Sequence, residues 1–427
     1  MKKKLIALAA LVLAVVAVWF ALRIYQEASG ALPIISPAPE LPAGDEDLPF
    51  TVPQGFSVSV FSRETPGARA LTRDPKGTLL ASLMSKGKIV ALPDIDSNGK
   101  ADEVITILEG LRNPHGILIH CPDPIREPPA SNGAGTGSES ARQDACRLYV
   151  AEEDVVRSYA YDADTFTVSS PRTIVSLPQS GGHSTRTLLL HPDGKTLLVS
   201  VGSSCNVCEE KDARRAKVLA IDIEEGAFGT PTDFSTGLRN MVFMAIHPVT
   251  GEIWGTEMGR DLLGDDTPPD EVNILERGKN YGWPICYGKN VHDSAYDKNT
   301  YFRNPCMEPF EIPSHIDIPA HSAPLGLAFV PEEGWPEDYW HDLFVAYHGS
   351  WNRSTPTGYK IVRFDLDPHG KPTGEVSDFM AGFILPAQAG DGRTVIGRPV
   401  DILIQPGGTM YVSDDRAGAI YRIYRTR

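Results

Sequence analysis

Short apolar runs separated by polar turns recur along most of the chain, and no long stretch has the period of an amphipathic helix. Each recurring unit consists of a turn with Pro or Gly, a strand that often contains an aromatic residue, and a second strand. This order is typical of an antiparallel hairpin. Six units are recognised by their turns, which are DPKG from residue 74, NPHG from 113, HPDG from 191, HPVTG from 247, VPEEG from 330 and QPGG from 405.

The six hairpin units predict an all-β fold, namely a six-bladed β-propeller. They return at an uneven period of roughly 40–80 residues. A single antiparallel sheet cannot bury both of its faces, and packing six sheets around one axis removes that problem. A β-sandwich and a β-solenoid are the alternatives. A sandwich is usually shorter than this chain of 427 residues, and a solenoid has a tighter period.

The N-terminus departs from this pattern, because three lysines precede an uninterrupted apolar run from Leu5 to Leu22. Residues 1–28 are predicted to form a helix that is either a cleaved signal peptide or an N-terminal membrane anchor. Residues 29–50 are rich in Pro and are predicted to be an extended linker. Residues 51–427 would then form the propeller, which both alternatives place in the periplasm or elsewhere outside the cytoplasm.

The cysteines fit an oxidising compartment, because their number is six and therefore even. Three pairs that are close in sequence are predicted to form local disulfides: Cys121–Cys146, Cys205–Cys208 and Cys286–Cys306. The CNVC segment is followed by Glu209 and not by the His of a c-type haem motif, and there is no second CxxC for a structural zinc site. Disulfides are therefore the favoured interpretation, with the Cys205–Cys208 pair the least secured by the sequence.

Composition and charge bear on the choice of partner. The chain has a globular composition and a net charge of −15, and no run of basic residues interleaves with aromatic ones. Such a distribution argues against a nucleic-acid partner.

Candidate chemistry is expected in polar clusters between strands, because propellers carry functional groups on loops at one mouth of the channel. In GGHSTR, His183 lies at the start of a blade strand and could take up a proton near neutral pH, the alternative being a histidine that only satisfies a local hydrogen bond. Arg239 and Asn240 occupy the matching position of the next unit, where they suit a carboxylate or a developing oxyanion. His321 and Arg398 precede later units.

Two segments are rich in acidic residues. The loop EMGRDLLGDDTPPDEVN at 257–273 offers many oxygen ligands for Ca²⁺, with a solvated acidic loop as the alternative. The segment DIDSNGKADE at 94–103 resembles the start of an EF-hand loop, with Asp94, Asp96 and Asn98 in alternation, but Ile105 stands where the closing Glu belongs. A turn between blades is favoured there over a second Ca²⁺ site.

The segment YHGSWNRSTPTGYK at 347–360 combines a flat aromatic surface, an amide and a cation in Trp351, Asn352 and Arg353. A planar anionic ligand would use all three. The alternative is an ordinary long hairpin loop.

In combination these motifs resemble the soluble quinoprotein sugar dehydrogenases, and most closely their sorbosone or pyranose dehydrogenase branch. The resemblance spans about residues 110–405, nearly the whole globular region, and depends on the order of the motifs, since each alone is modest. The carrying segments are GLRNPHGI, GGHSTRTLLLHPDGKTLLVSVGSSCN, GLRNMVF, EMGRDLLGDDTPPDEVN, NYGWP, HSAPLGLAF, HGSWNRSTPTGYK and GRPVDI.

The resemblance implies pyrroloquinoline quinone and Ca²⁺ as cofactors and the oxidation of an aldose or 2-ketoaldose at C1. His183 matches the general base that removes the proton from the anomeric hydroxyl, while hydride passes to the quinone. Arg239 matches the catalytic arginine near the quinone oxygens, and Asn240 matches its neighbouring cofactor contact. The main-chain carbonyls of Gly259 and Arg260 match the calcium loop, with Asp261 beside them.

The resemblance also implies further residues that contact the cofactor. Arg398 matches a basic residue that pairs with a cofactor carboxylate. Glucose-oxidising relatives carry a cofactor-binding lysine in the loop that here has the sequence HGSWNR, and that lysine has no plain counterpart. The candidates in its place are His348, Trp351, Arg353 and Lys360. This departure favours the sorbosone or pyranose branch over glucose as substrate.

The implied partners are a small sugar and an external electron acceptor, a quinone or a cytochrome, with membrane anchoring by the N-terminal helix as a further expectation. Two other classes of protein remain as alternatives. One is a calcium-dependent hydrolase of the lactonase type, which would need several acidic side chains around an axial metal, whereas the mouth positions here are mostly basic. The other is a non-catalytic propeller that binds a glycan or a protein.

Overall fold

The computed structural model of the chain describes residues 39–121, 146–224, 230–307, 311–374, 376–385 and 394–426. The predicted N-terminal helix at 1–28 and the first part of the predicted linker lie outside the described residues. Within the ranges above, no helix has the length and apolar character needed to span a bilayer. The regular structure described here is almost entirely strand, with only short 3₁₀ turns such as η1 (Asp45–Asp47).

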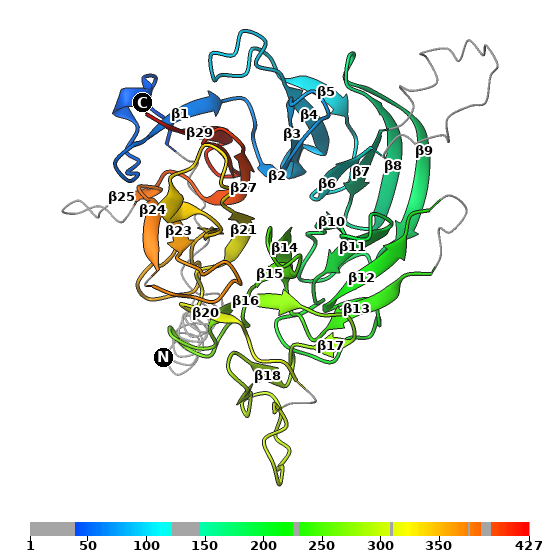
Figure 1. Cartoon of the computed structure of the whole chain (residues 1–427). Coiled ribbons are helices and arrows are strands. Elements are labelled where there is room, and N and C mark those ends of the chain that lie inside the picture. The colour runs from blue at the N-terminus through cyan, green and yellow to red at the C-terminus, as the bar shows by residue number, and fades with distance from the viewer. Residues whose placement is uncertain are drawn as a thin grey trace, which may run out of the picture.

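The strands form six antiparallel sheets arranged as blades around a central axis (Figure 1). The first three blades follow one another along the chain. Blade one contains β2 (Ala68–Arg73), β3 (Leu79–Leu83), β4 (Lys88–Leu92) and β5 (Ile105–Leu108). Blade two contains β6 (Ile117–His120), β7 (Arg147–Ala151), β8 (Val155–Asp162) and β9 (Thr167–Ser176). Blade three contains β10 (Leu188–Leu190), β11 (Thr196–Val201), β12 (Lys217–Asp222) and β13 (Thr232–Thr236), with β17 (Lys279–Asn280) added in parallel to β13.

The remaining blades complete the ring. Blade four contains β14 (Met241–Ile246), β15 (Ile253–Glu257), β16 (Asp270–Leu275) and β20 (Ile316–Ile318). Blade five contains β21 (Pro324–Phe329), β22 (Leu343–Tyr347), β23 (Lys360–Phe364) and β24 (Ser377–Met380). Blade six contains β27 (Pro399–Gln405), β28 (Thr409–Asp414), β29 (Ala419–Arg425) and, as its outer strand, β1 (Phe56–Ser62). The pairing of β1 with β29 joins the two ends of the described chain and closes the ring.

The predicted all-β fold and six-bladed propeller are confirmed. Five of the six predicted turns join the first two strands of a blade, as HPDG does between β10 and β11. The sixth, NPHG from residue 113, comes directly before β6, the first strand of blade two. The strand β11 is buried from Leu197 to Val201 without alternation. Its neighbours explain why, because Leu197 and Val199 pack against Ala151 and Val156 of blade two. The core lies between the blades, so an inner strand is covered on both faces and carries apolar residues at successive positions.

Several local features can be compared with the predictions. The three predicted disulfides are confirmed, with both cysteines of every pair described. The acidic turn at 94–103 joins β4 to β5 within one blade, so its predicted place between blades was wrong. Within the predicted linker, Phe50 packs against Phe383 and Tyr421 with ring centroids 4.7 Å apart in each case.

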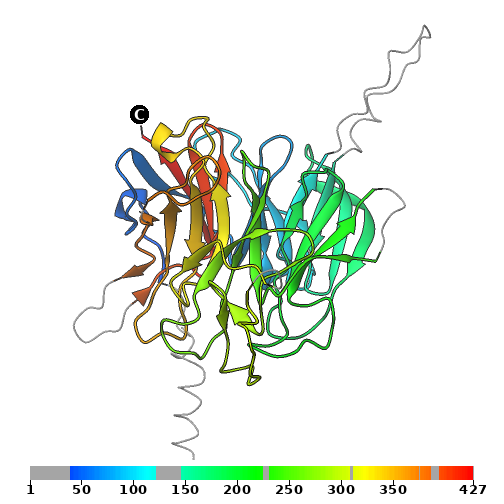
Figure 2. The same ribbon diagram turned by 60° about the horizontal axis from the view of Figure 1, so that its bottom comes forward.

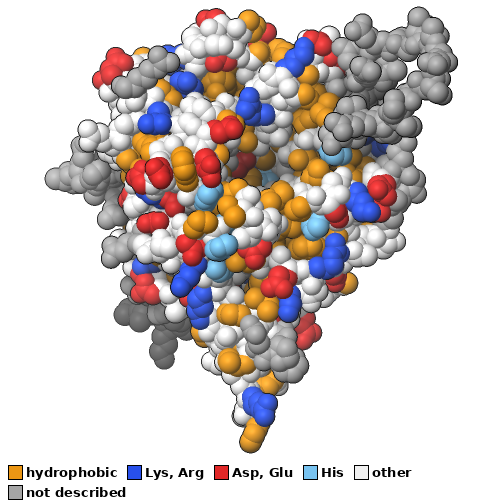
Figure 3. Space-filling model, viewed as in Figure 1, with side chains coloured by type: hydrophobic (Ala, Val, Ile, Leu, Met, Phe, Trp, Pro, Cys, Tyr) orange, Lys and Arg blue, Asp and Glu red, His pale blue; other side chains and the backbone are white. Residues whose placement is uncertain are grey.

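The outline of the ring is interrupted on one side by an excursion from blade four (Figure 1). This excursion carries the small hairpin of β18 (Cys286–Tyr287) and β19 (Val291–His292), and the Cys286–Cys306 disulfide closes it. A second small hairpin pairs β25 (Ile384–Leu385) with β26 (Thr394–Val395). Figure 2 shows the sheets standing side by side around the axis. On the face seen in Figure 3, acidic and basic side chains are interspersed around a hollowed centre.

Candidate active site

A cavity of about 260 Å³ lies where the loops before several inner strands converge. The strands β10, β14, β21 and β27 are the first strands of their blades, so the residues that precede them lie at the same mouth of the ring. Eight of the predicted site residues line this cavity: His183, Arg239, Asn240, Gly259, Asp261, His348, Trp351 and Arg398. His321, which the sequence also places at the mouth, and Asn352 of the 347–360 segment line it as well.

His183 is held by one ring nitrogen and presents the other. Its Nδ1 lies 3.0 Å from the carbonyl oxygen of Ser203, which can only accept a hydrogen bond, so Nδ1 carries the proton. In the neutral ring, Nε2 is then the free base. Burial and the nearby charge of Arg239 lower the pKa of His183 to about 3, so the imidazole is neutral at physiological pH.

Gly202 leaves room for His183 and Asn240 to pack closely against its backbone. A Cβ atom at Gly202 would lie 2.7 Å from the Cβ of His183 and 2.8 Å from Oδ1 of Asn240, which is too close for either contact. Oδ1 of Asn240 is buried and has no hydrogen-bond partner among the described residues. A buried amide oxygen of this kind is costly unless a ligand or water donates to it.

Arg239 is buried, and all of its N–H groups donate to acceptors within the protein. Its Nε and Nη2 donate to the main-chain and side-chain oxygens of Asn206, each at 2.9 Å. Its Nη1 donates to the carbonyls of Met258 and Gly259, and Nη2 also pairs with Asp261 at 3.0 Å. These bonds use all five N–H donors of a guanidinium. Burial lowers the pKa of Arg239, and the carboxylate of Asp261 opposes that effect and keeps the side chain charged.

Arg398 lies in a different environment. Its Nε donates to the carbonyl of His348 at 3.0 Å, and Nη2 donates to the carbonyl of Gly349. Burial lowers the pKa of Arg398, although the group remains a cation at neutral pH. Among the described residues no hydrogen bond is made by Nη1, so this arginine has donors available for an anion in the cavity.

His348 adds a second imidazole to the cavity. Its Nε2 lies 2.9 Å from Oδ1 of Asp415, whose other oxygen accepts from Arg69 at 2.7 Å. Burial, opposed by Asp415, lowers the pKa of His348 to about 4. The carboxylate accepts a hydrogen bond from Nε2–H and so fixes the orientation of the imidazole. In the neutral ring, Nδ1 is then the nitrogen without a proton.

Two carboxylates lie on the cavity wall. Besides its pairing with Arg239, Asp261 accepts from Nδ2 of Asn352 at 2.8 Å. Asp270 is buried and accepts the main-chain N–H groups of Gly259 and Ala323, each at 2.8 Å. Desolvation raises the pKa of Asp270 to about 7. These carboxylates and the carbonyl of Gly259 are hard oxygen donors of the kind that Ca²⁺ prefers, and the carbonyl of Gly259 is engaged by Arg239 in this structure.

Three predicted site residues are not brought into the cavity lining. Arg260 turns to Asp293, with Nε 2.9 Å from the carboxylate. Arg353 donates to the carbonyl of Ala320 and pairs with Asp266 at 2.7 Å. Lys360 pairs with Asp378 at 2.6 Å, across the outer strands β23 and β24.

The residues that hold the site are those that the sequence motifs did not single out. Ser203, Asn206 and Asp415 each bind a side chain that lines the cavity. A signal exists for Asn206, because it stands between the two cysteines of CNVC. Ser203 and Asp415 follow the strands β11 and β28 and have no distinctive motif.

A six-bladed propeller with a basic, histidine-containing cavity at one mouth is the class of protein that the fold and site define. Within this class, the chain belongs to the TrAA12-like family, whose model matches residues 138–426. The predicted membership of the soluble quinoprotein sugar dehydrogenases is confirmed at this family level.

Two relatives illustrate the spread of the family. An uncharacterized protein of Borreliella burgdorferi is 30% identical over 382 residues, which cover 87% of this chain and 90% of the relative. A pyrroloquinoline quinone-dependent pyranose dehydrogenase of Coprinopsis cinerea is 24% identical over 88% of this chain. The chain spans about half the length of that second relative, because the match covers 54% of it.

Two solved structures share the fold. The holo form of the pyranose dehydrogenase PQQ domain from Coprinopsis cinerea superposes with a TM-score of 0.71 at 23% identity, covering 91% of this chain and 98% of that domain. The calcium structure of the Trichoderma reesei enzyme of carbohydrate-active family AA12 gives a TM-score of 0.69 at 22% identity, covering 93% of this chain and all of that one.

Proposed function

We propose that the protein is an oxidoreductase that oxidises the C1 hydroxyl or aldehyde of a pyranose or 2-ketoaldose, with pyrroloquinoline quinone and Ca²⁺ as cofactors. The observation that carries the proposal is the imidazole of His183, whose Nδ1 is tied to a main-chain carbonyl within the cavity. The free Nε2 is then available to a substrate hydroxyl. The names of the Coprinopsis cinerea and Hypocrea jecorina relatives, which are pyrroloquinoline quinone-dependent pyranose and sugar dehydrogenases, support the same chemistry.

The cavity residues fit the cofactor. Pyrroloquinoline quinone is planar and carries three carboxylates, and the unused donors of Arg398 suit one of them. The buried Oδ1 atoms of Asn240 and Asn352 have no partner among the described residues and would accept from a donor on a bound ligand. When bound, the quinone supplies the two-electron acceptor for the sugar's hydride.

His183 acts first on the substrate in this proposal. Its Nε2 accepts the proton of the C1 hydroxyl, while Ser203 keeps the ring in the required orientation. Arg239 needs no reorganisation, because its hydrogen bonds already hold the positive charge beside His183. Trp351 lines the cavity with its side chain partly exposed and offers a flat apolar surface to one face of a sugar ring.

In this proposal Ca²⁺ binds to the loop that follows β15. Asp261 and the main-chain carbonyls of Gly259 and Arg260 are the proposed ligands, and oxygen ligands are what a hard cation requires. Arg239 would then share the carbonyl of Gly259 with the ion or release it. Ca²⁺ at this place would act as a Lewis acid beside the cofactor.

The proposed location is outside the cytoplasm. Three disulfides in the described part of the chain support an oxidising compartment, and the apolar run from Leu5 to Leu22 supports export. Anchoring by that N-terminal segment and transfer of electrons to an external quinone or cytochrome are parts of the same proposal.

Reconstitution tests the proposal directly. The purified protein is titrated with pyrroloquinoline quinone in the presence of Ca²⁺, and reduction of a dye is then followed across a panel of pyranoses and 2-ketoaldoses. We expect a holoenzyme absorption spectrum and turnover of at least one sugar, both lost after chelation of Ca²⁺ and restored by adding it back. Neither spectrum nor turnover would overturn the proposal. Lactone hydrolysis without the quinone would favour the lactonase-type alternative instead.

A further inference from the structure

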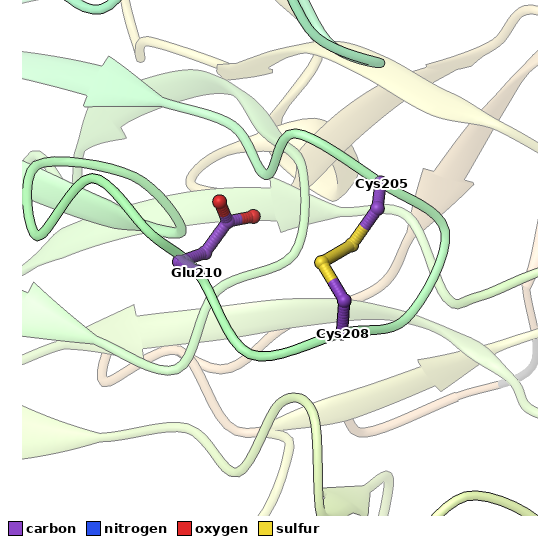
Figure 4. A group of neighbouring side chains, drawn as sticks. All are labelled: Cys205, Cys208 and Glu210. Carbon is purple, nitrogen blue, oxygen red and sulfur yellow. A yellow bond between two sulfur atoms is a disulfide. The ribbon is translucent and has the colours of Figure 1, made fainter.

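The CNVC segment forms a small covalent ring beside the active-site cavity. The disulfide between Cys205 and Cys208 closes this ring around Asn206 and Val207 (Figure 4). Glu210 lies close to the disulfide in the same view and accepts from the main-chain N–H and the hydroxyl of Ser204 at 2.6 and 2.8 Å. The loop after β11 therefore has two anchors, of which one is covalent.

Asn206 is the residue through which this ring reaches the site. It accepts two hydrogen bonds from Arg239, one on its main-chain oxygen and one on Oδ1. Its Oδ1 also accepts the N–H of Asp261 at 2.8 Å, and its Nδ2 donates to the carbonyl of Asp261 at 3.0 Å. Nε1 of Trp283 donates to the main-chain oxygen at 3.3 Å. One side chain thus sets the position of both the cavity arginine and the carboxylate that pairs with it.

The covalent CNVC ring also contacts His183 through Ser203. The hydroxyl of Ser203 donates to the carbonyl of Cys205 at 2.6 Å, and the main-chain oxygen of Ser203 holds Nδ1 of His183. The tautomer and the orientation of the histidine therefore depend on a residue that is itself bound to the ring.

The two cysteines of the CNVC ring are partly accessible to solvent. Cys208 lines a groove of about 700 Å³, and both Cys205 and Cys208 are only partly buried. The Cys286–Cys306 pair differs, because its cysteines are 6% and 0% exposed. The Cys121–Cys146 pair is at least partly accessible, but it lies where β6 ends and β7 begins, at the end of blade two that points away from the mouth. A thiol reagent can therefore reach the Cys205–Cys208 bond without unfolding the propeller.

We infer that the Cys205–Cys208 disulfide is a thiol-reducible clamp that holds Asn206 on Arg239 and Asp261, and that a dithiol is the reagent that opens it. In the reaction a thiolate of the dithiol attacks one sulfur and breaks the S–S bond, forming a mixed disulfide. The second thiol of the reagent resolves it. Cys205 and Cys208 end as thiols after gaining two electrons and two protons, and the dithiol ends as a disulfide.

Opening of the ring frees the segment that carries Asn206, while Glu210 retains the start of the loop. Arg239 then loses two of its five acceptors, and Asp261 loses both of its contacts with Asn206. We expect the blades to stay folded, because their strands are held by ladders and core contacts that the ring does not touch. The consequence is a loosened cavity wall in an intact propeller.

Hydrogen–deuterium exchange on the cofactor-free protein tests the clamp independently of the proposed activity. Limited treatment with dithiothreitol is followed by alkylation and mass mapping to find which cysteines have been labelled. We expect Cys205 and Cys208 to be labelled while Cys286 and Cys306 are not. Exchange should rise in residues 202–208 and 257–262, with the strands of the blades unchanged. Unchanged exchange at 257–262 in protein labelled at both cysteines would overturn the inference.

Paired variants separate the clamp from a general effect of lost disulfides. The variant Cys205→Ser/Cys208→Ser should show raised exchange at 257–262 without any reductant and no further response to dithiothreitol. The matched control Cys121→Ser/Cys146→Ser should behave as the unmodified protein at 257–262 and remain sensitive to the reagent. Equal exchange in the two double variants would contradict the inference.

A third measurement identifies Asn206 as the positioning residue. Asn206→Ala keeps the disulfide but removes the side-chain contacts with Arg239 and Asp261. It should reproduce the raised exchange at 257–262 and, in reconstituted enzyme, lower kcat and quinone affinity about as much as opening the disulfide does. This last readout depends on the proposed function, whereas the exchange measurement does not. If Asn206→Ala leaves exchange at 257–262 unchanged, the ring does not act through Asn206.

Discussion

On one side of the cavity, His183 and Arg239 lie beside the loop that follows β11; on the other, His348 and Arg398 lie beside the turn that follows β28. Each side has an imidazole and a guanidinium, but their partners differ. Nδ1 of His183 faces a main-chain carbonyl, whereas Nε2 of His348 faces the carboxylate of Asp415. All N–H donors of Arg239 bind protein acceptors, whereas Nη1 of Arg398 makes no hydrogen bond among the described residues.

The comparison teaches that residue type alone does not decide a role in this cavity. A carbonyl sets the tautomer of His183 without adding a negative charge, and this leaves a neutral imidazole with a free Nε2 at the cavity. An arginine whose N–H donors are all bonded within the protein contributes a positive charge in a fixed position. An arginine with free donors can bind an anion. The side with His183 is therefore suited to proton transfer, and the side with Arg398 is suited to holding an anionic ligand.

The largest effect is expected from His183→Ala. Loss of the base should lower kcat of the reconstituted enzyme by about 10²- to 10⁴-fold. The affinity for pyrroloquinoline quinone, measured by fluorescence titration, should change much less. His348→Ala is the matched change on the other side, and we expect it to affect affinity more than kcat. Equal loss of both quantities in His183→Ala would show that the histidine is structural.

Arg398→Ala should have the next largest effect, and mainly on binding. A hydrogen bond to a charged group contributes about 1.5–3 kcal/mol, so the quinone should bind about 10- to 100-fold more weakly. Turnover at saturating quinone should be nearly retained. A full loss of kcat with unchanged affinity would reverse the roles assigned to the two sides.

The two histidines should also differ in their response to Asp415→Asn. In the cofactor-free protein, NMR titration should give a pKa of about 3 for His183 and about 4 for His348. Asp415 opposes the lowering of the pKa of His348, so its removal should lower that pKa further and leave His183 unchanged. Since a base works only above its pKa, both imidazoles should be neutral at pH 6.5. A shift of equal size at both histidines would contradict the separation of the two sides.

The smallest effects are expected from residues outside the cavity lining. Lys360→Ala removes a partly exposed ion pair with Asp378, and such a pair contributes about 0–1 kcal/mol to stability. Quinone affinity and kcat should both stay within about twofold, because pairs of this kind rarely couple to a distant site. A tenfold loss of affinity would restore Lys360 as a cofactor contact and show that the loop at 348–360 rearranges on binding.

Much of the fold could be predicted because a propeller blade begins with a local hairpin. The turns DPKG and HPDG identify β2–β3 and β10–β11 from a few adjacent residues, and six such signals imply six blades. The place of the 94–103 turn was mispredicted for a related reason. An acidic turn looks the same within a blade and between blades, and only the pairing of β4 with β5 distinguishes the two.

The candidate site could be predicted in part for the same reason. Residues that stand shortly before an inner strand, such as His183 and Arg398, lie at the mouth because the first strand of each blade begins there. Arg353 and Lys360 belong to a long loop and to an outer strand, so their side chains could turn to Asp266 and Asp378 instead. Periodicity along the chain carries no information about that choice.

The sequence by itself determined five hairpin turns, the three disulfide pairs and the identity of the residues at the mouth, because each depends on neighbours in the chain. Only the tertiary structure decided what each mouth residue does. Ser203 and Asp415 are separated from the histidines that they hold by 20 and 67 positions, and Asn206 is 33 positions from Arg239. The pairing of β10 with β11 and the packing of neighbouring blades bring these partners together. The partner then sets the tautomer, the charge and the free donors of each side chain.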